Sequence, residues 1–476
     1  MKSALVAVFI AGVFIFCTWF SLGTRLSEDD IMNLNFAWLP SWQSLAFALV
    51  VPFTHFYRPA GSLLYRLIFD LFGVNFLPFR IAIMLLMLAN IYLVYCLAQR
   101  LSQSREVGAM SALLYSFHGR LIDLYRNTGT LFDVLCATLS LSTLLWYVAV
   151  RQQGRTIHGW DWLKFLVLFI TALNAKEMAG AIPILLLVYE LIWFRRLTVK
   201  TAAPALVAGV LTALAAYGRT SFGSVLYGNP GYAMTFTFGH FTSHWGELLN
   251  AMLYRNEPGL AAWAVGSIFL LLFAIALIGR RKDLWFSLAF ALLGPLPVIF
   301  IPWRGFFVMC LPWAGWAMFM AIVLVDGRNW LRSRVRPGSA LPANPFEPER
   351  LILFVAVTAC IVWLPRAFPA PRGLYYEASQ RTIRVMKNDL VRAHCPLPKG
   401  ARILFLHDIF PADSLAPLEL TRLVYRDRTL RVDRPTLLKT PPDPQSYDAV
   451  FDYRGRDLVV VRTAAAPGKR LRWPKS

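Results

Sequence analysis

The segment ALVAVFIAGVFIFCTWFSLGTRLSEDDIMNL covers residues 4–34 and contains the two features that decide the fold. An apolar run extends from Ala4 to Leu22, and a run of roughly 18 or more apolar residues predicts a transmembrane helix. The run is longer than the apolar core of a signal peptide, and no small-residue cleavage site follows it, so we predict an uncleaved first span. Glu28, Asp29 and Asp30 follow closely, which places three carboxylates just beyond one end of that span.

The composition of the whole chain is that of a membrane protein. Of its 476 residues, 57% are hydrophobic and 16% are charged. Its mean hydropathy is +0.51. Soluble proteins usually contain about 25% charged residues, so this chain has too few charges to cover the surface of a soluble globular protein. Apolar runs recur as far as about position 365, which predicts a polytopic membrane protein.

The apolar runs predict eleven spans, of which the third and the fifth are short. They lie at about 4–22, 80–98, 106–119, 130–150, 163–175, 178–194, 201–217, 259–279, 284–301, 306–326 and 351–365. Basic residues gather in alternate loops, near positions 100–105, 151–164, 195–200, 280–282 and 328–336. The positive-inside rule then places Met1 in the cytoplasm and the carboxy-terminal tail outside, in what we expect to be a bacterial inner membrane.

The net charge of +21 does not indicate a nucleic-acid partner. Residues 366–476 hold 21 Lys and Arg against 11 Asp and Glu, a balance of +10, and much of the remainder lies in the loops. The chain has no Gly-rich phosphate loop and no aromatic-basic motif of the kind that reads RNA. Membrane topology and anionic lipid account for the charge better.

The cysteines and histidines predict neither a disulfide framework nor a protein metal site. Five of the six cysteines lie in apolar runs, and only Cys395 lies in the tail. No Cys/His spacing is typical of zinc. His240 and His244 are four residues apart and would share a face of a helix, as metal ligands do, but no third ligand accompanies them.

The fold class expected is an all-α polytopic membrane protein with a small carboxy-terminal α/β domain. Residues 1–365 form the membrane domain, with large outer loops at 23–79 and 218–258, and residues 366–476 form a soluble extracytoplasmic domain. FAWLPSWQSLAFALV (36–50) is typical of a helix that lies in the membrane interface. ARILFLHDIF (401–410) and DAVFDYRGRDLVVVR (448–462) contain strand-like runs, and YRGRD (453–457) predicts a turn between two strands.

The acidic segment has a structural interpretation of its own. Ser27 can cap a helix whose first turn contains Glu28, Asp29 and Asp30, because acidic side chains are favoured at helix N-termini. A helix cap and a catalytic acid are compatible, since a cap fixes the position of the acid. Glu28 is expected to be a solvated or capping residue.

Two further motifs give the chain a family resemblance. HFYRPAGSLLYRLIFDLFGVNFLPFRIAI (55–83) precedes and enters the second span, and ALNAKEMAGAIPILLLVYELI (172–192) joins two later spans. With SEDDI, they resemble motifs of the polytopic GT-C glycosyltransferases, in the branch of protein O-mannosyltransferases, TMTC-type proteins and ArnT-like enzymes. There an acidic pair follows the first span and a Tyr-Arg-Pro-Leu motif precedes the second, where this chain has Ala60 in the fourth position. The resemblance covers roughly residues 1–200.

The resemblance implies a GT-C-like fold and a sugar donor linked to polyprenyl phosphate, used at the outer face of the membrane. Asp29 occupies the family's usual catalytic position, and Asp30 would support it or contact the acceptor. One carboxylate suffices because phosphate leaves as a stable anion and only the acceptor hydroxyl needs a general base. Such a direct displacement inverts the anomeric centre. The residues expected to bind the donor phosphate are Arg58, Lys176 and Arg304, with Glu177, Tyr57 and His55 in support.

Each cation also has a structural interpretation. Arg58 can pair with an acid or with interfacial lipid. Lys176 and Glu177 can form an ion pair between helices. Arg304 can be a snorkelling anchor beside Trp303.

The sequence leaves the acceptor and two rival functions open. The acceptor is a protein, a glycolipid or a polysaccharide, and membrane lipid is a further partner. The sequence identifies no cofactor and leaves a dependence on a divalent cation open. A flippase or transporter of lipid-linked sugars needs polar groups along a path through the membrane, often in repeated halves, and the chain shows no repeat. An O-antigen-ligase-like enzyme would instead use a later outer loop, where 218–258 offers Glu247 and Glu257.

Overall fold

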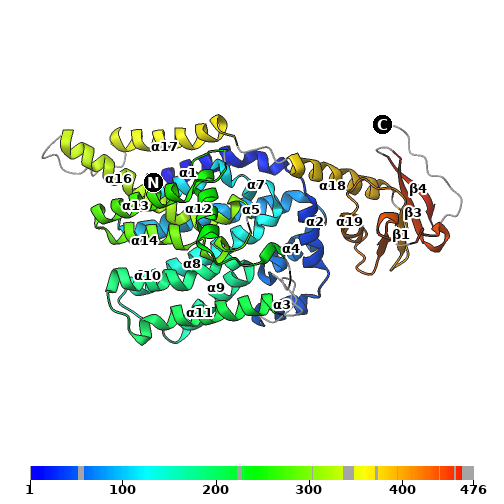
Figure 1. Ribbon diagram of the computed structural model, residues 1–476, viewed down its shortest axis with the longest axis horizontal. Coiled ribbons are helices and arrows are strands. Elements are labelled where there is room, and N and C mark those ends of the chain that lie inside the picture. The colour runs from blue at the N-terminus through cyan, green and yellow to red at the C-terminus, as the bar shows by residue number, and fades with distance from the viewer. Residues whose placement is uncertain are drawn as a thin grey trace.

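The protein is a bundle of helices with a small sheet near its carboxy terminus (Figure 1). The computed structural model describes residues 2–51, 58–221, 228, 230–256, 258–302, 304–335, 348–369, 374–393, 395–438, 440–454 and 457–463. The helices of the bundle are α1 (Lys2–Thr18), α2 (Glu28–Trp38), α3 (Trp42–Val50), α4 (Pro59–Phe72), α5 (Phe76–Ser102), α6 (Arg105–Ser116), α7 (Asp123–Arg126), α8 (Leu131–Gln152), α9 (Trp160–Ala175), α10 (Ile182–Phe194), α11 (Val199–Thr220), α12 (Phe238–Met252), α13 (Ala262–Gly279), α14 (Lys282–Leu293), α15 (Leu296–Ile299), α16 (Trp313–Val335) and α17 (Pro348–Ala367).

Short 3-10 turns join several of these helices. They are η1 (Trp19–Gly23), η2 (Gly119–Leu121), η3 (Thr128–Thr130), η4 (Glu177–Ala181), η5 (Pro230–Tyr232) and η6 (Phe306–Cys310).

Eight segments of the described chain are long and apolar enough to cross a bilayer, so the protein is an integral membrane protein. They are Ala4–Gly23, Phe76–Ser102, Thr128–Gln152, Glu177–Phe194, Val199–Thr220, Ala262–Gly279, Lys282–Ile299 and Pro348–Ala367. All eleven predicted spans coincide with helices, but α6, α9 and α16 are not among these eight. With 12 residues, α6 is about 18 Å long, which is short for a hydrocarbon core of about 30 Å. The count of eleven and the orientation of the termini stay predictions.

The loops that the charge pattern assigns to one side of the membrane do lie together. Gln152 Nε2 donates to the carbonyl of Arg100 over 2.9 Å, and Lys282 Nζ donates to the carbonyl of Trp193 over 3.0 Å. Glu106, in the first turn of α6, forms ion pairs with Arg328 and Arg350. These contacts involve residues of, or next to, all five predicted cytoplasmic loops and join them in two groups, as expected for loops on the same side.

The predicted interfacial helix is two elements. α2 ends at Trp38, and α3 begins after Ser41, whose side chain accepts a hydrogen bond from Ser44 N over 3.0 Å. The break falls at Pro40 because proline has no N–H group to continue a helix. α3 exposes apolar side chains, with Phe47 at 62% and Val50 at 80% of their surface, as an interfacial helix would.

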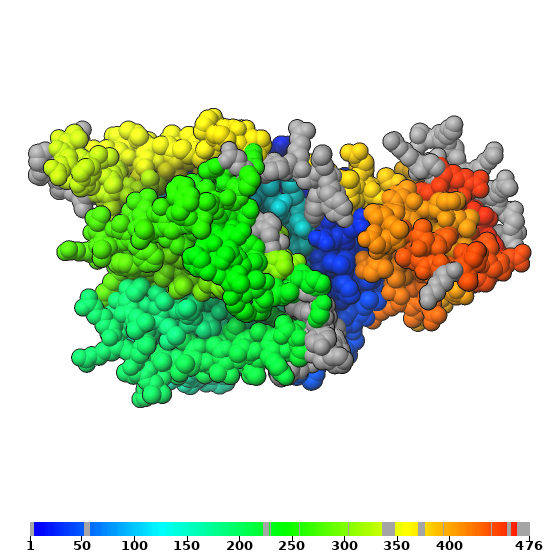
Figure 2. Space-filling model, in the orientation of Figure 1, coloured from blue at the N-terminus to red at the C-terminus, as the bar shows by residue number. Residues whose placement is uncertain are grey.

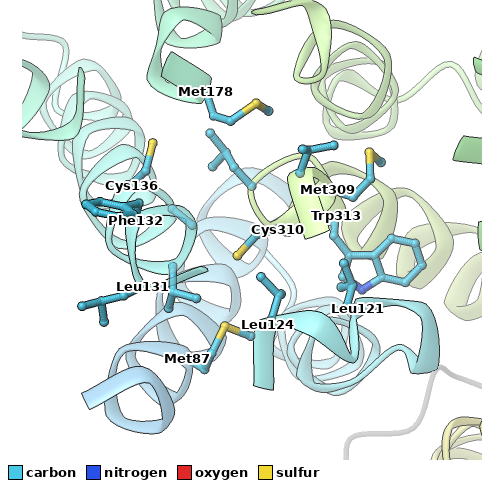
Figure 3. Packing of buried hydrophobic residues seen from close by; sticks show 14 of the residues in the cluster. Met87, Leu121, Leu124, Leu131, Phe132, Cys136, Met178, Met309, Cys310 and Trp313 are labelled. Carbon is cyan, nitrogen blue, oxygen red and sulfur yellow. The ribbon is translucent and has the colours of Figure 1, made fainter. Parts of the chain in front are cut away.

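The core is built from apolar side chains of distant segments. Figure 3 shows Met87 of α5, Cys136 of α8, Met178 of η4 and Cys310 of η6 in one cluster, and all four are buried. The cysteines here act as small apolar side chains, as expected for thiols in apolar runs.

The carboxy-terminal segment is a small α/β unit. It contains α18 (Leu374–Ala393), β1 (Arg402–Phe405), α19 (Ala416–Tyr425), β2 (Arg431–Asp433), η7 (Pro435–Leu437), η8 (Pro444–Ser446), β3 (Ala449–Arg454) and β4 (Asp457–Thr463). The strand order is β2-β1-β3-β4, with β1 parallel to β2 and β3, and β3 antiparallel to β4. The predicted strands within 401–410 and 448–462 are present, while residues 455–456 of the predicted turn lie outside the described residues. The sequence analysis missed β2 and both helices.

This segment docks on α2, at one end of the bundle (Figures 1 and 2). The guanidinium of Arg428 lies 5.0 Å from the ring centroid of Trp38, and that of Arg426 lies 5.4 Å from that of Phe69. Glu28 accepts a hydrogen bond from Ser414 Oγ over 2.7 Å, so Glu28 is a contact between segments rather than a solvated or capping residue.

Gly61 is required where α4 crosses α8. A Cβ atom on Gly61 would lie 2.1 Å from Cδ1 of Phe132, which is buried. We expect Gly61→Ala to lower the free energy of unfolding by about 1–3 kcal/mol, the usual effect of overpacking. Gly266→Ala is the matched control, since its Cβ would meet no atom within 4 Å, and it should be neutral or slightly stabilising. Thermal unfolding in nanodiscs measures both, and a Gly61→Ala protein as stable as wild type would contradict this packing.

Docking of the tail should depend on pH through Glu419 of α19. Burial raises the pKa of Glu419 from 4.5 to about 7, while its hydrogen bond with Asn35 and the charge of Arg422 act to lower it. The docked state therefore favours the protonated carboxyl, so docking is strongest below pH 4.5, weakens as the pH rises towards 7, and is weakest above 7. Each pKa unit corresponds to about 1.4 kcal/mol.

Hydrogen exchange of the α19 amides at pH 5 and pH 8 measures this effect. We expect faster exchange at pH 8 after correction for the intrinsic rate, and Glu419→Gln should remove the difference. A Glu419→Gln protein that keeps the full pH dependence would refute the assignment to this carboxyl.

Candidate functional site

The site begins at the first turn of α2, where the acidic segment forms a capping box. Ser27 Oγ accepts from Asp30 N, and Asp30 Oδ2 accepts from Ser27 N over 2.8 Å. The structural interpretation of the segment is therefore correct for Ser27 and Asp30, which cap the helix reciprocally.

Asp30 also connects α2 to a distant turn. Its second oxygen, Oδ1, accepts from Gly129 N in η3 over 2.9 Å, and the residue is 1% exposed. Both oxygens of this buried carboxylate thus bind backbone N–H groups, which fits the supporting role expected of Asp30.

Asp29 has different surroundings, because its side chain is exposed while that of Asp30 is buried. Partial burial by the surrounding protein raises the pKa of Asp29, and a hydrogen bond with the side chain of Asn127 opposes this shift. An accessible carboxylate with a raised pKa is a better proton acceptor than an ordinary aspartate. Of the two acids, the one predicted as the base is the one that solvent reaches.

Asn127 is oriented by the same turn. Its Oδ1 accepts from Gly129 N over 2.7 Å, so its amide nitrogen is the group that can donate to Asp29. A Cβ atom on Gly129 would lie 2.9 Å from Asn127 Oδ1 and 3.2 Å from Asn33 Nδ2, so only glycine fits here without displacement. Sequence analysis missed Asn127 and Gly129, and their Asn-Thr-Gly pattern is a turn signal that does not reveal a contact about 100 residues away.

Arg58, at the start of α4, is held by Glu177. Nη2 of Arg58 lies 2.9 Å from Oε1 and 3.2 Å from Oε2 of Glu177. The guanidinium also lies 5.3 Å from the ring centroid of Phe132. The two predicted site residues are therefore in direct contact, and the Glu177 carboxylate orients the Arg58 guanidinium.

Lys176 pairs with a carboxylate that sequence analysis missed. Its Nζ lies 2.6 Å from Oδ1 of Asp133 in α8, with both side chains almost completely buried. The predicted structural alternative, a pair between Lys176 and Glu177, is replaced by two crossed pairs. The reason is that the extended backbone at Lys176 (φ −162°, ψ 154°) ends α9 before η4 begins, and neighbouring side chains of extended backbone point in opposite directions.

Tyr65 is under the electrostatic influence of both the acids and the cations. Its hydroxyl donates to the carbonyl of Thr128 in η3 over 2.5 Å. Burial and the charge of Asp30 raise the pKa of Tyr65, with Asp29 adding a smaller effect, whereas Arg80 and Arg58 lower it. Both Asp29 and Arg58 are thus close enough to act on one phenol, so the acidic turn and the cation cluster form one site.

Arg304 lies in the loop before η6. Its guanidinium donates to the carbonyl of Gly231 and lies 4.0 Å from the ring centroid of Tyr232. Phe307, in η6, lies with its ring centroid 4.9 Å from Lys176 Nζ, which brings this loop to the cation cluster. His55, Tyr57 and Trp303 lie outside the described residues.

The histidine pair of α12 is also formed. The rings of His240 and His244 have centroids 4.2 Å apart, and His244 Nδ1 lies 2.6 Å from the carbonyl oxygen of Ile299. In the part of the chain that the structure describes, no group of three or more His, Cys, Asp or Glu side chains could hold a metal ion.

Comparison with known proteins gives a family match for part of the chain. Residues 54–218 match the family model described as dolichyl-phosphate-mannose-protein mannosyltransferase. This range includes Arg58, Asp133, Lys176 and Glu177, whereas Asp29 precedes it. No curated protein matches the sequence.

Solved structures share the fold. ArnT from Cupriavidus metallidurans bound to undecaprenyl phosphate is 16% identical, with a TM-score of 0.52 over 90% of this chain and 85% of that chain. Its apo form is 15% identical, with a TM-score of 0.50 over 91% and 86% of the two chains. An oligosaccharyltransferase from Archaeoglobus fulgidus is 13% identical with a TM-score of 0.49, and this chain, aligned over 90% of its residues, spans 63% of that length. The expected fold class and the resemblance to GT-C glycosyltransferases are confirmed.

Removing one partner of the buried pair of Lys176 and Asp133 should destabilise the protein strongly. Lys176→Met leaves the Asp133 carboxylate buried without its partner, and breaking such a pair costs about 3–5 kcal/mol. We expect a large fall in unfolding temperature, and partial recovery when Asp133→Leu is added. Arg155→Met is the control, because its pair with Asp161 is half exposed and should be worth less than about 1 kcal/mol. Equal effects of the two single substitutions would argue against a buried pair.

Proposed function

We propose that the protein is an inverting glycosyltransferase that moves a sugar from a polyprenyl-phosphate donor to an acceptor hydroxyl at the outer face of a bacterial inner membrane. The observation that carries this proposal is the pairing, in one site, of an accessible carboxylate with a raised pKa and a cluster of fixed cations. The fold shared with ArnT, which binds undecaprenyl phosphate, supports a lipid phosphate as the donor's anchor.

In the proposed reaction the acceptor oxygen attacks the anomeric carbon from the face opposite the phosphate. The Asp29 carboxylate takes the hydroxyl proton as the new carbon–oxygen bond forms. The bond between the anomeric carbon and the phosphate oxygen breaks, and polyprenyl phosphate leaves with the electron pair. Because attack and departure occur on opposite faces, the anomeric configuration inverts.

The cations would stabilise the departing phosphate. Arg58 offers guanidinium N–H groups and Lys176 an ammonium group, both suited to phosphate oxygens. Glu177 and Asp133 hold these two groups in place and balance their charges, so each cation is oriented before the donor arrives. Arg304, in the adjoining loop, is the third proposed phosphate ligand.

Asn127 would orient the Asp29 carboxylate. Its hydrogen bond with Asp29 directs the carboxylate while leaving the side chain accessible. A carboxylate held by a fixed donor loses less freedom when it binds an acceptor hydroxyl, which favours the reactive geometry. The acceptor class remains the set expected from sequence: a protein, a glycolipid or a polysaccharide hydroxyl.

Asp29→Asn should abolish transfer while leaving the protein folded. Asparagine keeps the size of the side chain and is itself favoured near a helix start, so thermal stability should change little. Without a proton acceptor we expect donor turnover to fall by at least about 100-fold, the lower end of what general-base catalysis contributes. Turnover of a panel of polyprenyl-phosphate sugars by purified protein in nanodiscs measures this.

Glu247→Gln is the matched control that distinguishes the proposed enzyme from an O-antigen-ligase-like enzyme. Glu247 lies in α12 beside Gly259, and an O-antigen-ligase-like enzyme would depend on it rather than on Asp29. Loss of turnover in Glu247→Gln with full activity in Asp29→Asn would favour that rival. Wild-type protein that moves a donor across vesicles without consuming it would favour a transporter.

A further inference from the structure

We propose that the carboxy-terminal segment positions Asp29, and that Glu28 is the residue through which it acts. The proposal rests on the proposed role of Asp29 as the base. It assigns to residues 374–463 a specific task in the reaction: they hold the first turn of α2 in the orientation that presents Asp29 to the acceptor.

Glu28 forms hydrogen bonds with two parts of the carboxy-terminal segment. Its backbone N–H donates to Ser379 Oγ of α18 over 2.9 Å, and its Oε2 accepts from Ser414 Oγ over 2.7 Å. The first N–H groups of a helix have no partner within the helix, so an outside acceptor fixes the direction in which the helix starts. Both bonds involve the residue immediately before Asp29.

A second contact reaches the other side of the base. Gln380, next to Ser379 on α18, directs Nε2 to the carbonyl of Arg126 at 3.4 Å. Arg126 precedes Asn127, which hydrogen-bonds to Asp29. The carboxy-terminal segment thus touches the neighbours of both members of the Asp29–Asn127 pair.

Ser414 is itself placed by a buried arginine. Arg434 is 3% exposed and forms an ion pair with Asp408, with Nε 2.6 Å from Oδ2 and Nη2 2.9 Å from Oδ1. The same guanidinium donates to four carbonyls of the loop that leads to α19, namely those of Phe410, Pro411, Ala412 and Ser414. The Arg434 side chain therefore fixes the conformation of this loop and places the Ser414 hydroxyl within hydrogen-bonding distance of Glu28.

Further contacts between the carboxy-terminal segment and α2 hold the hydrogen bond between Ser414 and Glu28 in place. Arg428 lies over Trp38 at the far end of α2, and Glu419 bonds to Asn35 in its middle. Contacts at the beginning, middle and end of one helix resist both tilting and sliding.

The test compares three variants of the full-length protein in nanodiscs. Glu28→Ala removes the acceptor for Ser414, Glu28→Gln keeps an oxygen that accepts from the same hydroxyl, and Ser414→Ala removes the donor. Asp413→Ala is the control, an exposed neighbour of Ser414 in the same loop. The measurements are kcat, KM for the donor, the acid limb of the pH profile of kcat, and hydrogen exchange of residues 27–33.

We expect kcat to fall about 10- to 100-fold in Glu28→Ala and in Ser414→Ala, because small misplacement of a reacting group costs rates of this order. KM for the donor and the acid limb should stay as in wild type, since neither the phosphate ligands nor the pKa of Asp29 changes. Glu28→Gln should recover most of kcat, and exchange of residues 27–33 should be faster only in the two impaired variants.

The opposite outcomes are equally definite. A Glu28→Ala protein with wild-type kcat and exchange, or a Glu28→Gln protein as impaired as Glu28→Ala, would overturn the positioning role while leaving the proposed function intact. A shift of the acid limb in Glu28→Gln would also overturn it, because the effect would then be electrostatic. Wild-type protein that consumes no donor would instead overturn the proposed function, and hydrogen exchange alone would then decide whether Glu28 orders the turn.

Discussion

The site depends on one buried carboxylate. Asp30 accepts hydrogen bonds from the backbone N–H groups of Ser27 and Gly129. A single side chain therefore caps the start of α2 and connects it to the turn before α8. Burial makes these bonds strong and makes their loss expensive, because each N–H group would otherwise be left without a partner away from water. Asp29 lies one residue before this tie and Asn127 lies two residues before Gly129, so the geometry of the accessible acid follows from that of the buried one.

The charged groups of the site are organised as crossed pairs. Arg58 meets Glu177 and Lys176 meets Asp133, so four segments of the membrane domain are joined by two ion pairs. Pairs of this kind add little net stability once formed, because desolvation offsets their attraction. They fix the direction of the two cations instead, and the proposed phosphate site requires this because long side chains would otherwise move freely.

The carboxy-terminal segment belongs to the same arrangement. Its sheet contacts neither Asp29 nor the cation cluster in any described interaction, yet its helices α18 and α19 and the loop between β1 and α19 reach α2. The carboxy-terminal segment is therefore in contact with the helix that carries Asp29, which is the basis of its proposed positioning role. Its docking surface mixes a titratable carboxyl, Glu419, with cation–aromatic contacts, which makes it sensitive to both pH and salt.

The sequence by itself determined the membrane class, the helical bundle, and the strands β1, β3 and β4 in the tail. These follow from apolar runs, alternation and basic loops, which are local patterns set by the bilayer and by strand geometry. It also singled out Asp29, Asp30, Arg58, Lys176 and Glu177, because acids after a span and cations beside prolines or within apolar runs are locally unusual.

Only the tertiary structure decided how these residues are used. Three contacts join residues that are distant in sequence. The ion pair of Lys176 with Asp133 spans 43 positions, and the hydrogen bond between Asn127 and Asp29 spans 98. The hydrogen bond from Ser414 to Glu28 spans 386 positions. The tertiary structure also separated Asp29 from Asp30, which are alike in sequence but differ in burial and partners. Contacts at such distances depend on how helices pack against one another, and no local pattern of residues carries that information.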